Sequence, residues 1–266
     1  MNEQDRNAQH QLEQGGVMNE RARVDKPEQP AALFTSAAVA AVVMSVVIAG
    51  EYVFRHYVMF WMPTVGSLRV NDMLALAMAY SLLTVAVGSL AHANWHQELR
   101  ELGQALRDFA TRRTFTPWLL GLTLGIAVLP AVDHWLWADL RLPMRISSFR
   151  NAAVWFPQAA SALGALALIA VNGVLVPVAE EYLWRGVIQA HLLRVLPGAM
   201  AIGITAIAFS LKHVIVDASW GRFLTLVAFG SICGMVAQRY TWRSSAALHL
   251  IVNTMSTVVA LVLGKA

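Results

Sequence analysis

Apolar runs of about 20 residues recur along this chain and constrain its fold more than any other feature. As an α-helix, a run of that length spans the bilayer core with every backbone polar group bonded within the segment. Hydrophobic residues make up 57% of the chain and charged residues 14%, against about 25% charged in soluble domains. We therefore expect an all-α membrane protein, a polytopic helix bundle in a lipid bilayer. A β-barrel is not expected, because its strands would alternate apolar and polar residues.

The apolar runs also predict the domain organisation. Seven crossings are expected, at about 32–50, 72–91, 116–137, 152–178, 199–216, 223–238 and 244–263. A short amphipathic helix over about 180–195, set off by Pro177, would make eight if it also inserts. Residues 1–31 are too polar to bury a core, so they predict a disordered N-terminal tail before a membrane domain over 32–266. Residues 92–115 are expected to form a charged loop.

The charge balance bears on partners and location. The net charge is +4 and the isoelectric point is near 9.6. The basic residues lie mostly between apolar runs, as is ordinary for a membrane protein that meets anionic headgroups. No basic recognition helix or zinc knuckle occurs, so no nucleic-acid partner is expected. A small excess of basic residues on the N-terminal side indicates a cytoplasmic N-terminus. The expected location is the inner or plasma membrane of a prokaryote. The oligomeric state stays open.

The stretch AEEYLWRGVI, Ala179–Ile188, places three ionisable residues in this apolar chain. Glu181 and Arg185 stand four residues apart with the acid first, the favourable order for a helical ion pair, so we expect a structural pair. Glu180 is rotated by about 100° from that face and has no such local partner. An ionisable group at membrane depth costs about 2.5 to 3.5 kcal/mol on insertion scales. Glu180 is therefore expected to act elsewhere in the bundle, left without a neutralising partner on its own helix.

Two further motifs place polar groups in apolar runs. FSLKH ends at His213, and HLIVN carries His249 and Asn253 four residues apart on one face. With Glu180, the two histidines suit a divalent metal such as Zn²⁺, and they equally suit a base that activates water. The residues do not decide between the two. Lys212, next to His213, is expected to extend toward the headgroups.

The three motifs together resemble a known family. EEYLWR at 180–185, FSLKH at 209–213 and HLIVN at 249–253 match in order and spacing the EExxxR, FxxxH and HxxxN pattern of the CPBP family. This is the CAAX-protease and bacteriocin-processing family of intramembrane proteases, also called ABI, related to the Rce1-type CAAX endoprotease. The resemblance covers about 172–263, where it implies a catalytic core that hydrolyses peptide bonds inside the bilayer.

The resemblance also implies residue roles. Glu180 is expected to activate water, and His213 to help hold that water or a metal. His249 and Asn253 are expected to stabilise the oxyanion or to complete a metal shell. If a metal such as Zn²⁺ is required, the implied ligands are Glu180, His213 and His249. The implied partner is a membrane-associated or prenylated protein or peptide substrate.

Two other functions are left open. One is a non-catalytic membrane scaffold or immunity factor that keeps the motif for stability. The other is a proton-coupled transporter with Glu180 and the histidines as a relay, which the lack of an internal repeat disfavours. No HExxH or GxSG occurs, which speaks against site-2-type and rhomboid-type proteases.

Two smaller features receive structural interpretations. Asn172, inside an apolar run, is expected to hydrogen-bond a neighbouring helix. The pair Gly230-Ser231 is expected to serve close packing of helices.

Overall fold

The computed structural model describes residues 30–58, 68–90, 93–111, 115–137, 140 and 162–262. Every regular element in these ranges is helical, which confirms the all-α expectation. Residues 1–29 of the expected tail, and the first ten residues of the crossing expected over 152–178, lie outside the described residues.

The described ranges form a series of α-helices with π-helical segments, labelled η, inserted among them. In chain order they are α2 Pro30–Val53, η1 Phe54–Val58, α4 Leu68–Leu90, α5 Trp95–Thr111, α6 Thr116–Trp137, α7 Ala162–Leu168, η4 Ile169–Leu175, α8 Val176–Glu181, η5 Tyr182–Gln189, α9 Ala190–Leu192, α10 Gly198–Asp217, α11 Phe223–Arg239 and α12 Trp242–Val262.

The number of crossings differs from the expected seven or eight. Within the described residues, five helices are long and apolar enough to span a membrane. They cover Leu33–Val53, Thr116–Trp137, Gly164–Leu192, Gly198–Asp217 and Trp242–Val262. The α4–α5 pair, bent by 116°, makes six if it counts as one broken span, and α11 is an apolar helix of shorter length. The integral-membrane character is supported, whereas the expected count is not confirmed.

The fourth run and the expected amphipathic helix are continuous, which excludes the eighth crossing. The chain stays helical from Gly164 to Leu192, so the separate helix expected over 180–195 is wrong. Pro177 lies in the first turn of α8, directly after the π-helical segment η4. The wider π turn accommodates the missing proline N–H without ending the helix. A second π-helical segment, η5, follows Glu181.

The loop expected over 92–115 is also wrong, because most of it is the helix α5. Asn94 caps its start, with Oδ1 accepting a hydrogen bond from the backbone three residues on. Leu102, Ala105 and Phe109 are buried at the spacing of one helix face. The many charged residues between them led to the prediction of a loop, because composition alone does not reveal the apolar stripe.

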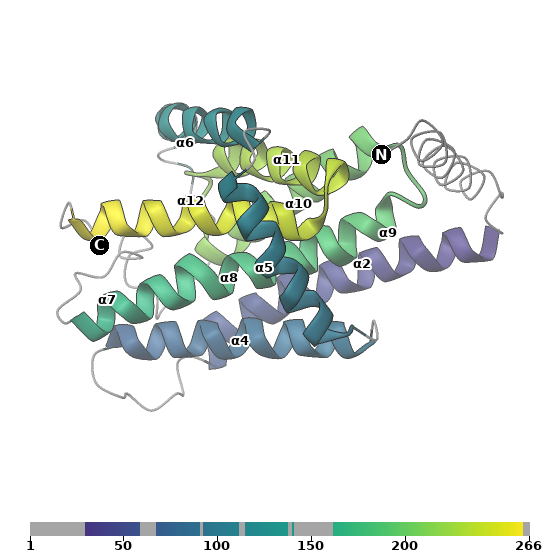
Figure 1. Cartoon of the computed structure of the whole chain (residues 1–266), viewed down its shortest axis with the longest axis horizontal. Coiled ribbons are helices and arrows are strands. Elements are labelled where there is room, and N and C mark those ends of the chain that lie inside the picture. The colour runs from purple at the N-terminus through teal and green to yellow at the C-terminus, as the bar shows by residue number, and fades with distance from the viewer. Residues whose placement is uncertain are drawn as a thin grey trace, which may run out of the picture.

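The helices pack so that the middle of the 164–192 helix is surrounded (Figure 1). α12 runs beside it and contacts η4 and α8, while α2 contacts η5 and α4 contacts α8. α10 and α11 pack against each other, and α6 covers α11. α5 lies across the bundle and packs on α12 (Figure 1). Trp184, Phe209 and Leu248 are almost fully buried at the centre.

The α10–α11 contact depends on a glycine. A Cβ at Gly230 would lie 3.1 Å from both Cα and Cβ of Ala206 and 3.3 Å from Nη2 of Arg185. This contact confirms the close packing expected at Gly230-Ser231. By contrast, a Cβ at Gly203 on α10 meets nothing within 4 Å.

We predict that Gly230→Ala destabilises the protein by about 1–3 kcal/mol, because the added methyl group forces α10 and α11 apart. Gly203→Ala is the matched control, and it should be neutral or stabilising, since alanine favours a helix over glycine by about 1 kcal/mol. Thermal unfolding in one detergent measures both variants. Equal melting temperatures for the two would contradict the packing account.

Candidate functional site

Three motif residues from three helices meet at the middle of the bundle. Glu180 is the penultimate residue of α8, with 3% of its surface exposed. His213 on α10 places Nε2 3.9 Å from Glu180 Oε1. His249 on α12 places Nε2 4.0 Å from Glu180 Oε2. These distances are too long for direct hydrogen bonds, but one water molecule can bridge each.

The other nitrogen of each imidazole is bonded to an acceptor. His213 Nδ1 lies 2.9 Å from the carbonyl oxygen of Phe209. His249 Nδ1 lies 3.0 Å from Glu181 Oε1. Because a carbonyl and a carboxylate only accept, each Nδ1 carries the hydrogen. In the neutral form, both Nε2 atoms therefore present a lone pair toward Glu180.

Glu181 belongs to a buried polar network beside this centre. Arg185 Nη1 lies 3.0 Å from Glu181 Oε1, in the expected i,i+4 arrangement. Ser245 Oγ donates to Glu181 Oε2 at 2.6 Å, and Arg185 Nη2 donates to the carbonyl of Gly230 at 3.1 Å. Glu181 is fully buried. Its contacts tie the 164–192 helix to α12 and fix the ring of His249, while Arg185 ties the same helix to α11.

Lys212 corrects an expectation from the sequence. It does not extend to the headgroups, since its side chain is 0% exposed. Its Nζ lies 2.6 Å from Glu180 Oε1 and 2.9 Å from Glu51 Oε2. The ammonium also donates to the Tyr80 hydroxyl at 3.1 Å. Glu180 has no cation on its own helix, as expected, but it is not left unneutralised, because Lys212 comes from α10.

Glu51 and Tyr80 are site residues that the sequence reasoning missed. The Tyr80 hydroxyl lies 2.7 Å from Glu51 Oε2 and 2.8 Å from Glu180 Oε1. Glu51 also pairs with Arg55 at 2.5 Å, four residues on. That i,i+4 spacing repeats the Glu181–Arg185 pattern and was a usable signal, whereas nothing around Tyr80 marked it.

Asn253 lies one helical turn after His249 on α12. Its Nδ2 donates to the backbone carbonyl of Asn172 at 3.2 Å. The Asn172 side chain donates in turn to Thr257 Oγ1 at 3.2 Å, which confirms the expected helix-to-helix bond. Asn253 is thus held against the 164–192 helix, and within the described residues it makes no hydrogen bond to the Glu180 carboxylate.

The residues expected to bind a metal do not fit one well. Among the described residues, no three His, Cys, Asp or Glu side chains form a group that could hold a metal ion. The two Nε2 atoms approach different oxygens of Glu180. The ammonium of Lys212 and the Tyr80 hydroxyl already bind Oε1. A cation in hydrogen-bond contact with the carboxylate competes with a divalent metal there, so we derive no step through a metal.

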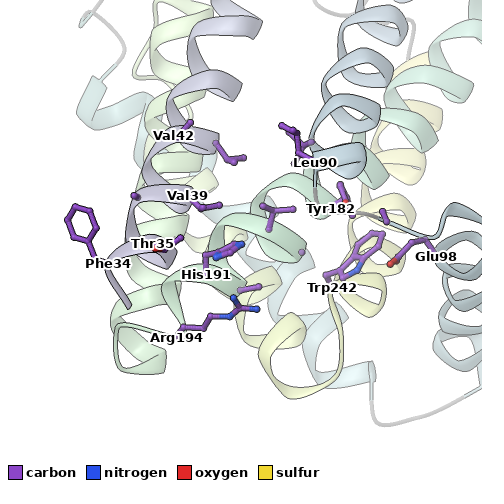
Figure 2. A pocket seen from close by; sticks show the side chains of 17 residues that line it. Phe34, Thr35, Val39, Val42, Leu90, Glu98, Tyr182, His191, Arg194 and Trp242 are labelled. Atoms are coloured by element: carbon purple, nitrogen blue, oxygen red, sulfur yellow. The ribbon is translucent and has the colours of Figure 1, made fainter. Parts of the chain in front are cut away.

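A cavity of about 850 Å³ lies beside the 164–192 helix, on the C-terminal side of Glu180. In Figure 2, Val39 and Val42 of α2 stand on one side and Tyr182 and Trp242 on the other. Its lining is mostly apolar, with His191 and Arg194 among the polar exceptions. Glu180 and the two site histidines do not line it.

Comparison with known proteins agrees with the motif resemblance. Residues 162–255 match the family model described as type II CAAX prenyl endopeptidase Rce1-like. No curated protein and no solved structure matches the chain. The matched range contains all three motifs, as expected for the segment of about 172–263. Residues 162–255 are therefore similar to the Rce1-like domain of the CPBP family.

Proposed function

We propose that the protein is an intramembrane endopeptidase that hydrolyses a peptide bond of a membrane-associated or prenylated protein or peptide. The observation that carries the proposal is the buried Glu180 carboxylate with an imidazole Nε2 about 4 Å from each of its oxygens. The match to a family of CAAX prenyl endopeptidases supports it. So does the continuous 164–192 helix, which is long enough to hold this centre at membrane depth.

Glu180 is proposed as the general base. Its Oε1 accepts from Lys212 and Tyr80, and no hydrogen bond within the described residues takes Oε2. A water molecule near Oε2 can give its proton to that oxygen as its own oxygen attacks the substrate carbonyl carbon. The same proton then passes to the leaving amine nitrogen as the C–N bond breaks. This use of one carboxylate as base and then acid follows general acid–base catalysis.

The two histidines suit different parts of this reaction. His213 Nδ1 donates to a backbone carbonyl, so a neutral ring keeps Nε2 as an acceptor for a hydrogen of the attacking water. His249 lies against the Glu181 carboxylate, which holds the ring in place through Nδ1. A ring that also carries hydrogen on Nε2 can donate it to the developing oxyanion. The proposed roles thus follow from the acceptor behind each ring.

Asn253 is proposed to share the oxyanion with His249. One hydrogen of its amide is used by the Asn172 carbonyl, which orients the side chain. The second amide hydrogen is left to donate, since the NH₂ group has two. Fixed donors of this kind stabilise charge as it forms in the transition state.

The apolar cavity gives the substrate a place to lie. It borders Tyr182 and Gly186, on the same helix as Glu180. Its apolar lining suits the aliphatic part of a membrane-associated substrate, in keeping with the prenylated substrates that the family name describes.

We predict that Glu180→Gln lowers kcat by about 10²–10⁴-fold, because glutamine cannot accept the proton. His213→Ala should have an effect in the same range. The measurement uses the purified protein in proteoliposomes, an internally quenched farnesylated CAAX peptide, and the same peptide without the lipid. Mass spectrometry identifies the new termini. Cleavage by Glu180→Gln at the wild-type rate, or no cleavage by the wild type, contradicts the proposal and favours a scaffold or transporter.

We predict that Asn253→Ala lowers kcat by about 10²-fold with little change in KM, as expected for loss of one oxyanion donor. Asn172→Ala is the matched control, because it removes a side chain but keeps the backbone carbonyl that Asn253 contacts. It should retain most of the activity. Equal losses in both variants would indicate a packing role for Asn253 instead.

We predict that Arg185→Met destabilises the protein by about 3–5 kcal/mol, because it leaves the Glu181 carboxylate charged and buried. Arg239→Met removes an exposed arginine of α11 and should leave the melting temperature nearly unchanged. Thermal unfolding and membrane abundance report on both. A melting temperature for Arg185→Met equal to that of the control would show that the pair is not structural.

A further inference from the structure

The carboxylates around Tyr80 need the hydrogen-bond donors of Lys212 as well as the single proton of the tyrosine. The Tyr80 hydroxyl has one proton but lies within 2.8 Å of two carboxylates, those of Glu51 and Glu180. It can donate to one of them at a time. The ammonium of Lys212 has three donors, and its three neighbours are Glu180, Glu51 and Tyr80. Each of these three neighbours therefore lies within reach of one hydrogen of the ammonium.

The charges balance in the same way. Glu51 and Glu180 carry two negative charges, and Arg55 and Lys212 carry two positive ones. All four side chains are at most 7% exposed. Arg55 also lies 3.8 Å from Asp217, which pairs with Arg222 at 2.5 Å. Without Lys212, two carboxylates in a low dielectric would share one tyrosine proton and one arginine.

Half of this arrangement lies outside the family-matched range. Glu51 is on α2 and Tyr80 is on α4, both before residue 162, where the match begins. Lys212 stands next to the motif histidine His213, on α10. The centre is thus completed by helices that the motifs do not mark.

We propose that Lys212, Glu51 and Tyr80 form a positioning unit for the Glu180 carboxylate, supplied in part by α2 and α4. The unit holds Oε1 and keeps the carboxylate ionised, so that Oε2 faces the attacking water. The three residues act through Glu180 and need not touch the substrate. The inference rests on the proposed function for its catalytic consequence, while the charge coupling itself can be tested separately.

A merely structural salt bridge and a positioning unit predict different outcomes for a second substitution. Lys212→Met removes a positive charge and leaves one excess negative charge in the cluster. The double variant Lys212→Met with Glu51→Gln removes one charge of each sign, and the cluster is neutral again. In that variant Tyr80 faces one carboxylate, that of Glu180, instead of two. If the unit acts through charge, the second substitution rescues the first; if each residue only packs, the losses add.

The test measures kcat, KM and melting temperature of the full-length protein in proteoliposomes with the farnesylated CAAX peptide. We expect Lys212→Met to lower kcat by about 100-fold, within the range for disabling a general base. KM should change little, because Lys212 is buried among side chains of the protein. The double variant should regain about tenfold in kcat, since contacting residues couple strongly. Lys212→Arg, which keeps the charge, should lose less than Lys212→Met.

The melting temperature gives the readout that does not depend on catalysis. It should fall in Lys212→Met and rise again in the double variant, whatever the substrate is. Tyr80→Phe is the mild variant that keeps all charges, and it should fold while lowering kcat by about tenfold through loss of one donor. A double variant no better than Lys212→Met in both kcat and melting temperature overturns the positioning unit. Rescue of the melting temperature together with an active Glu180→Gln protein would overturn the proposed function but not the charge coupling.

Discussion

Neutralisation of buried charge is the constraint on which the rest of this structure depends. A carboxylate at membrane depth must find a cation or lose its charge, because little water is there to solvate it. Glu181 meets this need within its own helix through Arg185. Glu180 cannot, and it takes its cation from Lys212 on α10. That single requirement fixes α10 against the 164–192 helix and brings α2 and α4 to the same point through Glu51 and Tyr80.

Two adjacent carboxylates thus serve different faces of the bundle. Glu181 points to α12, where Ser245 and His249 complete its bonds. Glu180 points to α4 and α10 and keeps one oxygen without a hydrogen bond in the described residues. The divergence follows from the helical rotation between neighbours. π-helical segments lie before α8 and directly after Glu181. Such segments occur frequently at functional sites. Local geometry therefore separates the structural acid from the acid available for chemistry.

The parts that the sequence predicted were those encoded by local spacing or by a motif. The Glu181–Arg185 arrangement follows from an i,i+4 spacing. The meeting of Glu180 with two histidines follows from the order of the three motifs. The loop expected at 92–115 was wrong because charged residues mask the apolar stripe of α5. The prediction for Lys212 was wrong because a long basic side chain in a membrane protein normally reaches water. Its actual partners come from α2 and α4, and no local pattern connects such distant segments.

Pairing with a cation works against the use of Glu180 as a base, since a neutralised carboxylate attracts protons less. In this setting the alternative is worse. A buried carboxylate without a cation would hold a proton at neutral pH and could accept none from water. Lys212 binds Oε1 and keeps the group ionised, while Oε2 stays available. A buried ion pair often adds little stability over an apolar replacement, so its presence here is better explained by the ionised state that it preserves than by the energy that it contributes.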